Sequence, residues 1–228
     1  MSKYGILLRG LLTDWTKYII EEYEEKFPNA EIVVSTWDHQ DVSNLSCKTI
    51  QNSEPVKQKL NPTINRMIVQ IQKGLESMDS EIILQCRVDQ FIHNKNIFKI
   101  FEKSCKNKIM VPHIGTETRN YYCNDYAQLA TKEILNEFWF NMPYFEGDSK
   151  ISTEEYIAKQ YVTKIKHDLS PWEKCQHKYF CFKGFFEDFK LEWHSFANYS
   201  SYSDLYLHVK KQHSISYEKF LKDFIRLS

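Results

Sequence analysis

Three short apolar runs constrain the fold of this chain most strongly, because each of them is followed at once by polar residues. The runs are Ile6–Leu8, Ile32–Val34 and Ile82–Leu84. Strands buried on both faces have continuous apolar runs of this kind, which are typical of parallel sheets. Helical periodicity separates the first two runs and ends at Phe27-Pro28, because proline cannot continue a helix. The N-terminal part therefore predicts a right-handed strand–helix–strand unit.

The remaining periodicity continues the alternation of strands and helices. It predicts helices over residues 61–78, 96–106, 126–140 and from 152 onward, a strand over 108–111, and irregular chain over 43–60. Apolar residues that recur every three or four positions are the basis for the helices. A chain that alternates in this way belongs to the α/β class, in which helices flank a mostly parallel sheet.

Composition divides the chain into two parts. Its 228 residues carry 30 basic and 30 acidic side chains, and this balance gives no reason to expect nucleic acid as a partner. Aromatic residues gather beyond Pro171. We therefore expect a domain over 1–168 and an aromatic-rich helical C-terminal subdomain over 169–228 packed on it. Aromatic side chains near lysines also leave peripheral membrane contact open, and a homo-oligomer is not excluded.

The cysteines indicate a cellular compartment. The six are widely spaced, and no signal-peptide pattern precedes them, so we expect reduced thiols in a cytoplasmic protein. Peripheral attachment at the inner face of the cytoplasmic membrane stays open, but no apolar run is long enough to span a bilayer. Cys175, His177, Cys181 and His194 lack the ligand spacing of a zinc site.

Polar clusters stand where strands end or helices begin. In an open α/β sheet, ligands bind beyond the carboxyl ends of the strands, so we expect these clusters to meet at one edge. Each has an ordinary structural alternative as well: a turn glycine, a solvated loop, a surface ion pair, a helix cap or a charge at a helix end. The clusters are Arg9-Gly10, Trp37 to Asp41, Asn65-Arg66, Arg87-Val88-Asp89, Asn124-Asp125 and Glu154.

Together these residue types suit a diphosphate attached to a base or sugar. Asp89 could hold Mg²⁺ or Mn²⁺ through its oxygens, and Arg87 could balance phosphate charge. Arg66 falls in the first turn of a predicted helix, where a cation opposes the helix dipole, so we expect it to have an anionic partner. Trp37 could wall or stack on a base, and a further carboxylate could accept a proton from an acceptor hydroxyl.

Several of these segments resemble the WavE family of lipopolysaccharide-synthesis proteins. The matching segments, in order, are Pro28 to Trp37 followed by Asp41-Val42, then Asn65-Arg66-Met67-Ile68, Arg87-Val88-Asp89 and Thr153-Glu154-Glu155-Tyr156-Ile157. The likeness runs from about residue 6 to about residue 164. That family is similar to GT-A glycosyltransferases, which implies a mixed, mostly parallel sheet. Its Arg-x-Asp looks like the counterpart of the Asp-x-Asp metal motif of that fold.

The resemblance implies a glycosyltransferase that uses a nucleotide-sugar donor and a glycan or lipid-linked glycan acceptor, in lipopolysaccharide or capsule synthesis. It implies Asp89 as the ligand of Mn²⁺ or Mg²⁺, if a metal is used at all, and Glu154 or Asp125 as the catalytic base. The implied donor-binding residues are Arg9, Gly10, Trp37, Asp38, Asp41, Asn65, Arg66 and Arg87.

Two other functions remain open. A non-catalytic scaffold of the same fold could bind an enzyme of a polysaccharide-assembly complex through the aromatic C-terminal part. Another nucleotide-dependent transferase would cleave the donor between its phosphates. Fold alone does not decide among these functions.

Overall fold

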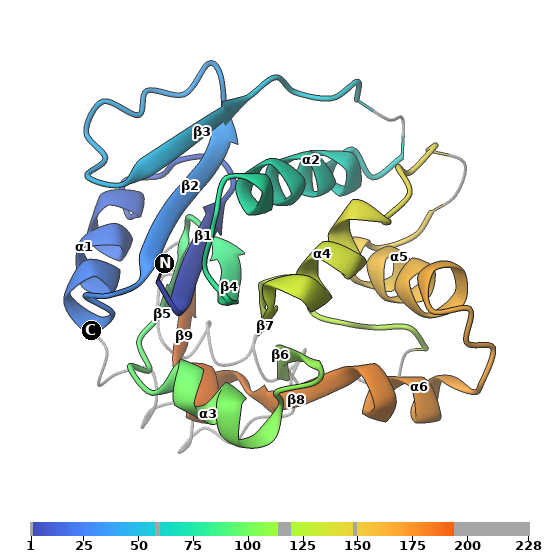
Figure 1. Ribbon diagram of the computed structural model, residues 1–228. Coiled ribbons are helices and arrows are strands. Elements are labelled where there is room, and N and C mark those ends of the chain that lie inside the picture. Colours follow the sequence, from blue (N-terminus) through green and yellow to red (C-terminus); the bar gives the residue numbers. More distant parts are fainter. Residues whose placement is uncertain (1, 58–59, 114–119, 148–149, 194–228) are drawn as a thin grey trace, which may run out of the picture.

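In a computed structural model of the chain, a mixed seven-stranded sheet is flanked by helices (Figure 1). The structure describes residues 2–57, 60–113, 120–147 and 150–193. Its strands are β1 (Tyr4–Arg9), β2 (Glu31–Trp37), β3 (Lys48–Asn52), β4 (Ile82–Arg87), β5 (Gln90–Ile92), β6 (Ile109–His113), β7 (Ala127–Thr131), β8 (Phe180–Gly184) and β9 (Leu191–Trp193). Its α-helices are α1 (Thr16–Lys26), α2 (Thr63–Glu76), α3 (Ile97–Ser104), α4 (Lys132–Phe140), α5 (Thr153–Gln160) and α6 (Trp172–Tyr179), and π-helical turns η1 (Tyr161–Ile165) and η2 (Phe185–Phe189) follow α5 and β8.

The order of the strands is β3-β2-β1-β4-β7-β6-β8. Neighbours from β3 to β4 are parallel, β7 is antiparallel to both β4 and β6, and β8 is parallel to β6. A separate antiparallel pair joins β5 to β9. The expected mixed, mostly parallel α/β sheet is confirmed, and so is the N-terminal strand–helix–strand unit.

The three apolar runs form the centre of the sheet. Ile6, Leu7 and Leu8 are wholly buried on β1, as continuous apolar strands covered on both faces should be. Helix α2 lies across β1 and β2 (Figure 1). A Cβ atom added at Gly74 of α2 would come within 2.3 Å of a Leu7 methyl carbon, so this glycine lets the helix approach the strand closely. The opposite, N-terminal end of α2 borders the site.

Two sequence predictions are wrong about strands. Residues 48–52, expected to be irregular, form β3 beside β2. The expected helix over 126–140 is instead strand β7 followed by helix α4, whose N-cap is Thr131 with its hydroxyl accepting from the Ile134 amide. The sequence Ala-Gln-Leu-Ala-Thr of β7 has little intrinsic strand preference. Its position between β4 and β6 decides its conformation, because tertiary context overrides such preferences.

The C-terminal part is continuous with the sheet as far as the structure describes it. Strand β8 forms the edge of the sheet beside β6, and β9 pairs with β5. Residues 169–193 therefore contain strands as well as helical turns. Most of the expected 169–228 subdomain lies outside the described residues, and the division at residue 168 stays a prediction.

The expectation of six reduced cysteines is wrong for two of them. Cys105 and Cys181 form a disulfide with their Cα atoms 5.6 Å apart. Cys105 follows α3, and the next turn enters β6, whose neighbour β8 carries Cys181 in register with Met110. Pairing of β6 with β8 thus brings the two sulfurs together. The other four cysteines are free, and all but Cys47 are buried.

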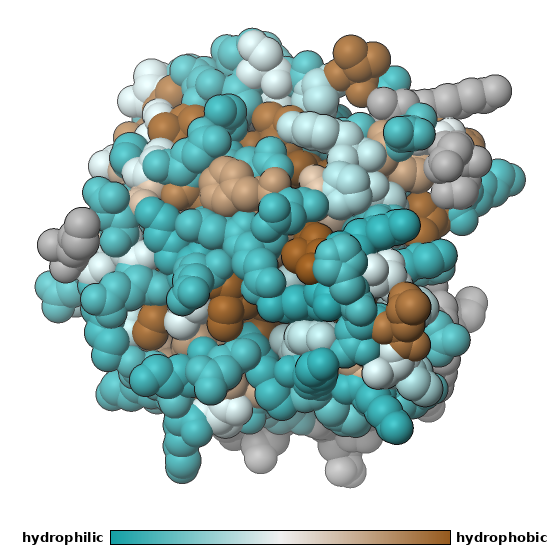
Figure 2. All heavy atoms as spheres, turned by 45° about the vertical axis from the view of Figure 1, so that its right-hand side comes forward, coloured by the Kyte–Doolittle hydropathy of each residue, from teal (hydrophilic) through white to brown (hydrophobic). Residues whose placement is uncertain are grey.

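Apolar residues on the face in Figure 2 are scattered among hydrophilic ones. Among the described helices, none combines the length and the apolar character needed to cross a bilayer.

Candidate functional site

The carboxyl ends of β1, β2 and β4 border a cleft of about 350 Å³. Arg9, the last residue of β1, stands in register with Arg87 at the end of β4 and with Ser35 of β2. The first turns of α2 cover the other side. This is the sheet edge at which α/β proteins bind ligands. Six of the predicted site residues line the cleft: Arg9, Gly10, Trp37, Arg66, Arg87 and Asp89.

Arg87 and Asp89 form a two-pronged ion pair at the end of β4. Arg87 donates from Nε to Oδ1 of Asp89 over 2.8 Å and from Nη2 to Oδ2 over 2.7 Å. The side chain of Asp89 is 11% exposed and that of Arg87 33%. Burial alone would lower the pKa of Arg87, but the bonds to Asp89 outweigh it and the pKa is raised. The two hydrogen bonds hold both side chains in one orientation.

Arg9 is buried and held by hydrogen bonds of its own. Its Nε donates to Oε1 of Gln85 over 3.1 Å, and its Nη2 donates to the Asp125 carbonyl oxygen over 2.6 Å. The Asp125 carboxylate lies 3.6 Å from Nη2. Burial lowers the pKa of Arg9, and the charge of Asp125 opposes that shift. The guanidinium is thus fixed by partners on β4 and on the segment before β7.

Arg66 has the partners that its position in a helix predicts. Its Nη2 lies 2.8 Å from Oε1 of Glu54, and its guanidinium carbon lies 5.2 Å from the ring centroid of Trp37. Trp37 is 1% exposed, so the indole serves as a buried support for the cation, an arrangement that stabilises both. The expected anionic partner of Arg66 is therefore a carboxylate of this chain.

Gly10 turns the chain at the mouth of the cleft. Its φ is +133°, and a Cβ atom there would lie 3.2 Å from a Val88 methyl carbon. Its carbonyl oxygen accepts hydrogen bonds from Thr36 Oγ1 over 2.8 Å and from Gln70 Nε2 over 3.4 Å. Residues that carry a side chain rarely adopt this backbone conformation, so the geometry of the turn requires glycine.

Three predicted donor residues lie outside the cleft lining. The side chain of Asp38 is 58% exposed and accepts from Ser53 Oγ. Asp41 is exposed and accepts from the Ser43 amide, a hydrogen bond that lowers its pKa. Asn65 is buried, and its amide group bonds both to the N–H and to the C=O of Phe145. The structure does not bring these three side chains into the cleft, and their contact with a donor stays a prediction.

The two candidate bases lie next to the cleft. Asp125 precedes a strand, so its interpretation as a helix cap is wrong. Glu154 is half-buried in the first turn of α5, where Thr153 meets the cleft residue Thr63 at 3.3 Å between hydroxyl oxygens. Burial raises the pKa of Tyr126, and the charges of Asp125 and Glu154 raise it further. Both carboxylates therefore lie within electrostatic reach of one tyrosine.

The sequence region that contains the cleft matches one family model. The model describes WavE lipopolysaccharide synthesis and matches residues 9–131, more than half of the 228 residues. The chain belongs to the WavE family of lipopolysaccharide-synthesis proteins. Its seven-stranded sheet is mixed and mostly parallel, as the resemblance to that family implied. No curated protein matches the chain.

Solved structures with a similar arrangement share little sequence with this WavE chain. An active-site mutant of LgtC has a TM-score of 0.47 at 12% identity, over 68% of this chain and 69% of that one. A glycosyltransferase involved in glycosylating the major capsid of PBCV-1 has a TM-score of 0.47 at 15% identity, over 95% of this chain and 98% of that one. A nucleotidyl transferase from Methanothermobacter thermautotroptrophicus has a TM-score of 0.43 at 11% identity, over 70% of this chain and 82% of that one. Scores this low carry no information about the activity of this chain.

Sequence reasoning missed half of the residues that line the cleft in this WavE protein. Thr63, Met67 and Gln70 share one face of α2 with Arg66, at the three- and four-residue spacing of a helix. That spacing was the available signal, because one functional residue on a helix places its neighbours three and four positions away beside it. The missed residues are Leu11, Thr13, Thr63, Met67, Gln70 and Val88.

The side chains around Asp89 do not fit a divalent cation. Both Asp89 oxygens accept hydrogen bonds from Arg87, and Asp125 is engaged by Arg9. Over the described ranges there is no group of three or more His, Cys, Asp or Glu side chains suited to a metal ion. A hard cation requires several oxygen ligands, and the carboxylates of Asp89, Asp125 and Glu54 at this WavE cleft already pair with arginines.

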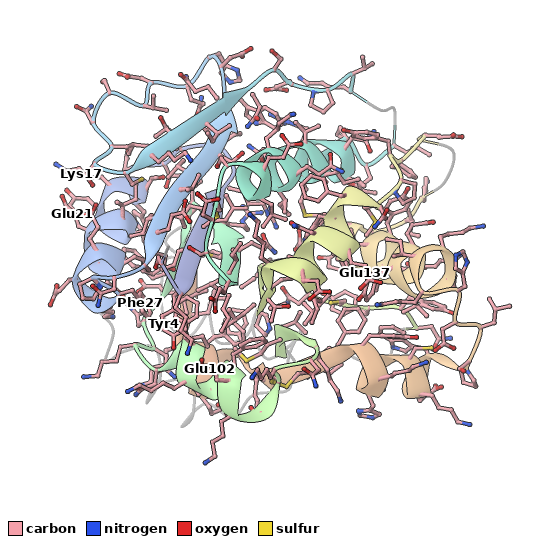
Figure 3. All side chains as sticks on the ribbon, in the orientation of Figure 1. Tyr4, Lys17, Glu21, Phe27, Glu102 and Glu137 are labelled. Carbon is pink, nitrogen blue, oxygen red and sulfur yellow. A yellow bond between two sulfur atoms is a disulfide. The ribbon has the colours of Figure 1, made fainter. Side chains whose placement is uncertain are left out.

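A larger cavity lies elsewhere on the molecule. It measures about 530 Å³ and is bordered by α4 and η1, with Glu137, Lys164 and His167 in its lining. Figure 3 shows Glu137 on α4, well apart from the labelled residues of α1. None of the predicted donor residues lines this cavity. Size alone would favour it, but a ligand site needs convergent polar groups, and the strand-end cleft has more of them.

Proposed function

We propose that this WavE protein is a glycosyltransferase that moves a sugar from a nucleotide-diphosphate donor to a glycan acceptor of lipopolysaccharide, capsule or another surface polysaccharide. One observation carries the proposal: three arginines and Asp89 meet in a cleft at the strand ends. Arginine is well suited to phosphate because its planar fork donates two parallel hydrogen bonds. The family to which the chain belongs gives the setting of the reaction.

The arginines are oriented before any donor binds. Each guanidinium has its own carboxylate: Asp125 for Arg9, Glu54 for Arg66 and Asp89 for Arg87. Side chains that are fixed in advance lose less conformational entropy on binding. The diphosphate of the donor would lie against Arg66 and Arg87, the two arginines with partly exposed side chains, while Arg9 contributes its charge from below.

Apolar groups in the same cleft suit the nucleotide base. Leu11, Met67 and Val88 line it beside the polar groups, and they would enclose a flat ring next to the diphosphate. Trp37 supports Arg66 rather than offering an open face to the base. Small-molecule sites combine an apolar wall with a few placed polar groups in this way.

Of the two carboxylates beside the cleft, Glu154 is the better general base. The Asp125 carboxylate lies 3.6 Å from the buried guanidinium of Arg9, and this contact makes Asp125 a positioning group for that arginine. Glu154 stands where α5 approaches the mouth of the cleft through the Thr153–Thr63 contact. A base in an inverting transfer must reach the acceptor hydroxyl directly or through one water. A retaining transfer would not require it there.

The test is transfer or hydrolysis with a panel of nucleotide sugars, comparing the wild type with Asp89→Ala. We expect the variant to lose about 100-fold in rate, because a misplaced Arg87 no longer holds the diphosphate in reactive geometry. Asp79→Ala removes an exposed carboxylate in the turn before β4 and should leave the rate unchanged. Equal rates for Asp89→Ala and wild type would defeat the assignment. Absence of binding to any nucleotide would favour a non-catalytic scaffold.

A further inference from the structure

The residue two positions before Asp89 is a cation in this chain. Arg87 donates one hydrogen bond to each carboxylate oxygen of Asp89, over 2.8 and 2.7 Å. A divalent ion bound to the same carboxylate would lie only a few ångströms from the guanidinium, where the like charges repel. Either the metal or Arg87 can hold Asp89 in this geometry, and in the structure Arg87 holds it.

Two other carboxylates near the cleft, those of Asp125 and Glu54, are in the same situation. Asp125 lies 3.6 Å from Arg9, and Glu54 lies 2.8 Å from Arg66. A magnesium or manganese ion in a transferase site usually binds one or two carboxylates together with the substrate phosphates. Here each of the three carboxylates already neutralises an arginine. Metal binding through any of these three carboxylates would have to displace an arginine.

Arg87 and Arg66 border the cleft while they hold their carboxylates. Arg87 directs two N–H groups to Asp89. The side chains of Arg87 and Arg66 are 33% and 23% exposed and line the cleft. Two such groups supply the positive charge that a diphosphate requires.

We propose that this cleft binds the donor diphosphate without a divalent cation, and that Arg87, clamped on Asp89, occupies the position that a metal would take. The inference rests on the glycosyltransferase function proposed above. It deepens that function by assigning the neutralising charge to the chain itself.

Calorimetric titration of the wild type with UDP, GDP and CDP, in EDTA and in Mn²⁺, tests the proposal. We expect at least one of them to bind, with dissociation constants in the two media that agree within about threefold. Binding that requires Mn²⁺ would overturn this inference and leave the proposed function standing. No binding in either medium would overturn the proposed function as well.

Removing the built-in cation gives a sharper test. In Arg87→Met we expect binding in EDTA to weaken by about tenfold or more, because charged hydrogen bonds to the phosphate are lost. Mn²⁺ should restore much of it, because Asp89 is now available as a ligand. The double variant Arg87→Met, Asp89→Asn should lose that restoration. If Arg87→Met binds in EDTA as tightly as the wild type, the proposal fails.

Lys17→Met is the matched control. Lys17 lies on α1, is 61% exposed and pairs loosely with Glu21 at 3.8 Å (Figure 3). The substitution Lys17→Met removes one positive charge, as Arg87→Met does, but from a surface outside the cleft lining. Nucleotide binding should therefore be unchanged. Thermal unfolding of every variant identifies any that fails to fold, and Arg87→Lys, which keeps the charge, then replaces Arg87→Met. Because Lys lacks the planar fork, Arg87→Lys should bind more weakly than the wild type in EDTA, and equal binding would overturn the proposal.

Discussion

At the scale of single residues, the site depends on carboxylates that hold its arginines in place. Its three arginines are held by carboxylates that are distant in sequence as well as by near neighbours. Arg87 and Asp89 are two residues apart, so their pairing could be predicted from the extended chain. Arg9 and the segment at Asp125 are 116 residues apart, and no local pattern indicates that contact. Sequence could therefore propose half of the residues that line the cleft, but not the contact that orients Arg9.

Glu54→Gln should loosen Arg66 without unfolding the protein. The Glu54 side chain is 25% exposed, and partly exposed ion pairs contribute only about 0–1 kcal/mol to stability. We expect the KM for the donor to rise several-fold while kcat changes little, because the pair acts on ground-state binding as much as on the transition state. Steady-state kinetics with the preferred nucleotide sugar would show this. An unchanged KM would mean that Trp37 alone positions Arg66.

Gly10→Ala should cost stability through the backbone. Alanine at a φ of +133° is strained, and its Cβ would press on Val88 at 3.2 Å. We expect a loss of about 1–3 kcal/mol in the free energy of unfolding, measured by urea denaturation, together with weaker nucleotide binding. If stability and binding both stay at the wild-type level, the turn is not constrained as described.

At the scale of elements, His93 connects α1 with β9. Its Nδ1 lies 2.7 Å from Glu22 and its Nε2 lies 3.0 Å from Glu192. Burial alone would lower the pKa of His93, but the bonds to the two carboxylates outweigh it and raise the pKa above its usual 6.5. A raised folded-state pKa means that the charged bridge contributes its full stability below about pH 6.5. That contribution is lost as the pH rises through the folded-state pKa.

The bridge predicts a pH dependence that one substitution removes. Free energies of unfolding measured from pH 5.5 to 8.5 should show a decrease for the wild type as the pH rises above about 6.5. In His93→Gln that decrease should be smaller, because glutamine does not titrate. Equal slopes for the two proteins would show that His93 does not stay protonated between the two carboxylates.

Element prediction from sequence succeeded where the pattern was local. The buried runs of β1, β2 and β4 and the apolar face of α2 were evident, and so was the capped start of α5. Strand β7 was missed because its residues favour a helix and only its neighbours β4 and β6 make it a strand. Strand β3 was missed because four of its five residues are not fully buried, which weakens the apolar signal.

At the scale of the whole molecule, the Cys105–Cys181 disulfide joins chain segments 76 residues apart. Closing a loop of that length should stabilise the oxidised protein by about 4 kcal/mol through the entropy of the unfolded chain. Under non-reducing denaturation, Cys105→Ser should be less stable by a comparable amount. Thiol titration of the unfolded wild type should give four free thiols. Six thiols before any reductant is added would contradict the pairing.

The central claim is that the residues at the carboxyl ends of β1, β2 and β4 bind a diphosphate next to Asp89. A crystal structure of the protein with a bound nucleoside diphosphate tests it most directly. The account predicts phosphate oxygens within hydrogen-bond distance of Arg66 and Arg87, with Asp89 still clamped by Arg87. Phosphates bound instead in the cavity beside α4 and η1, with the strand-end cleft empty, would contradict it.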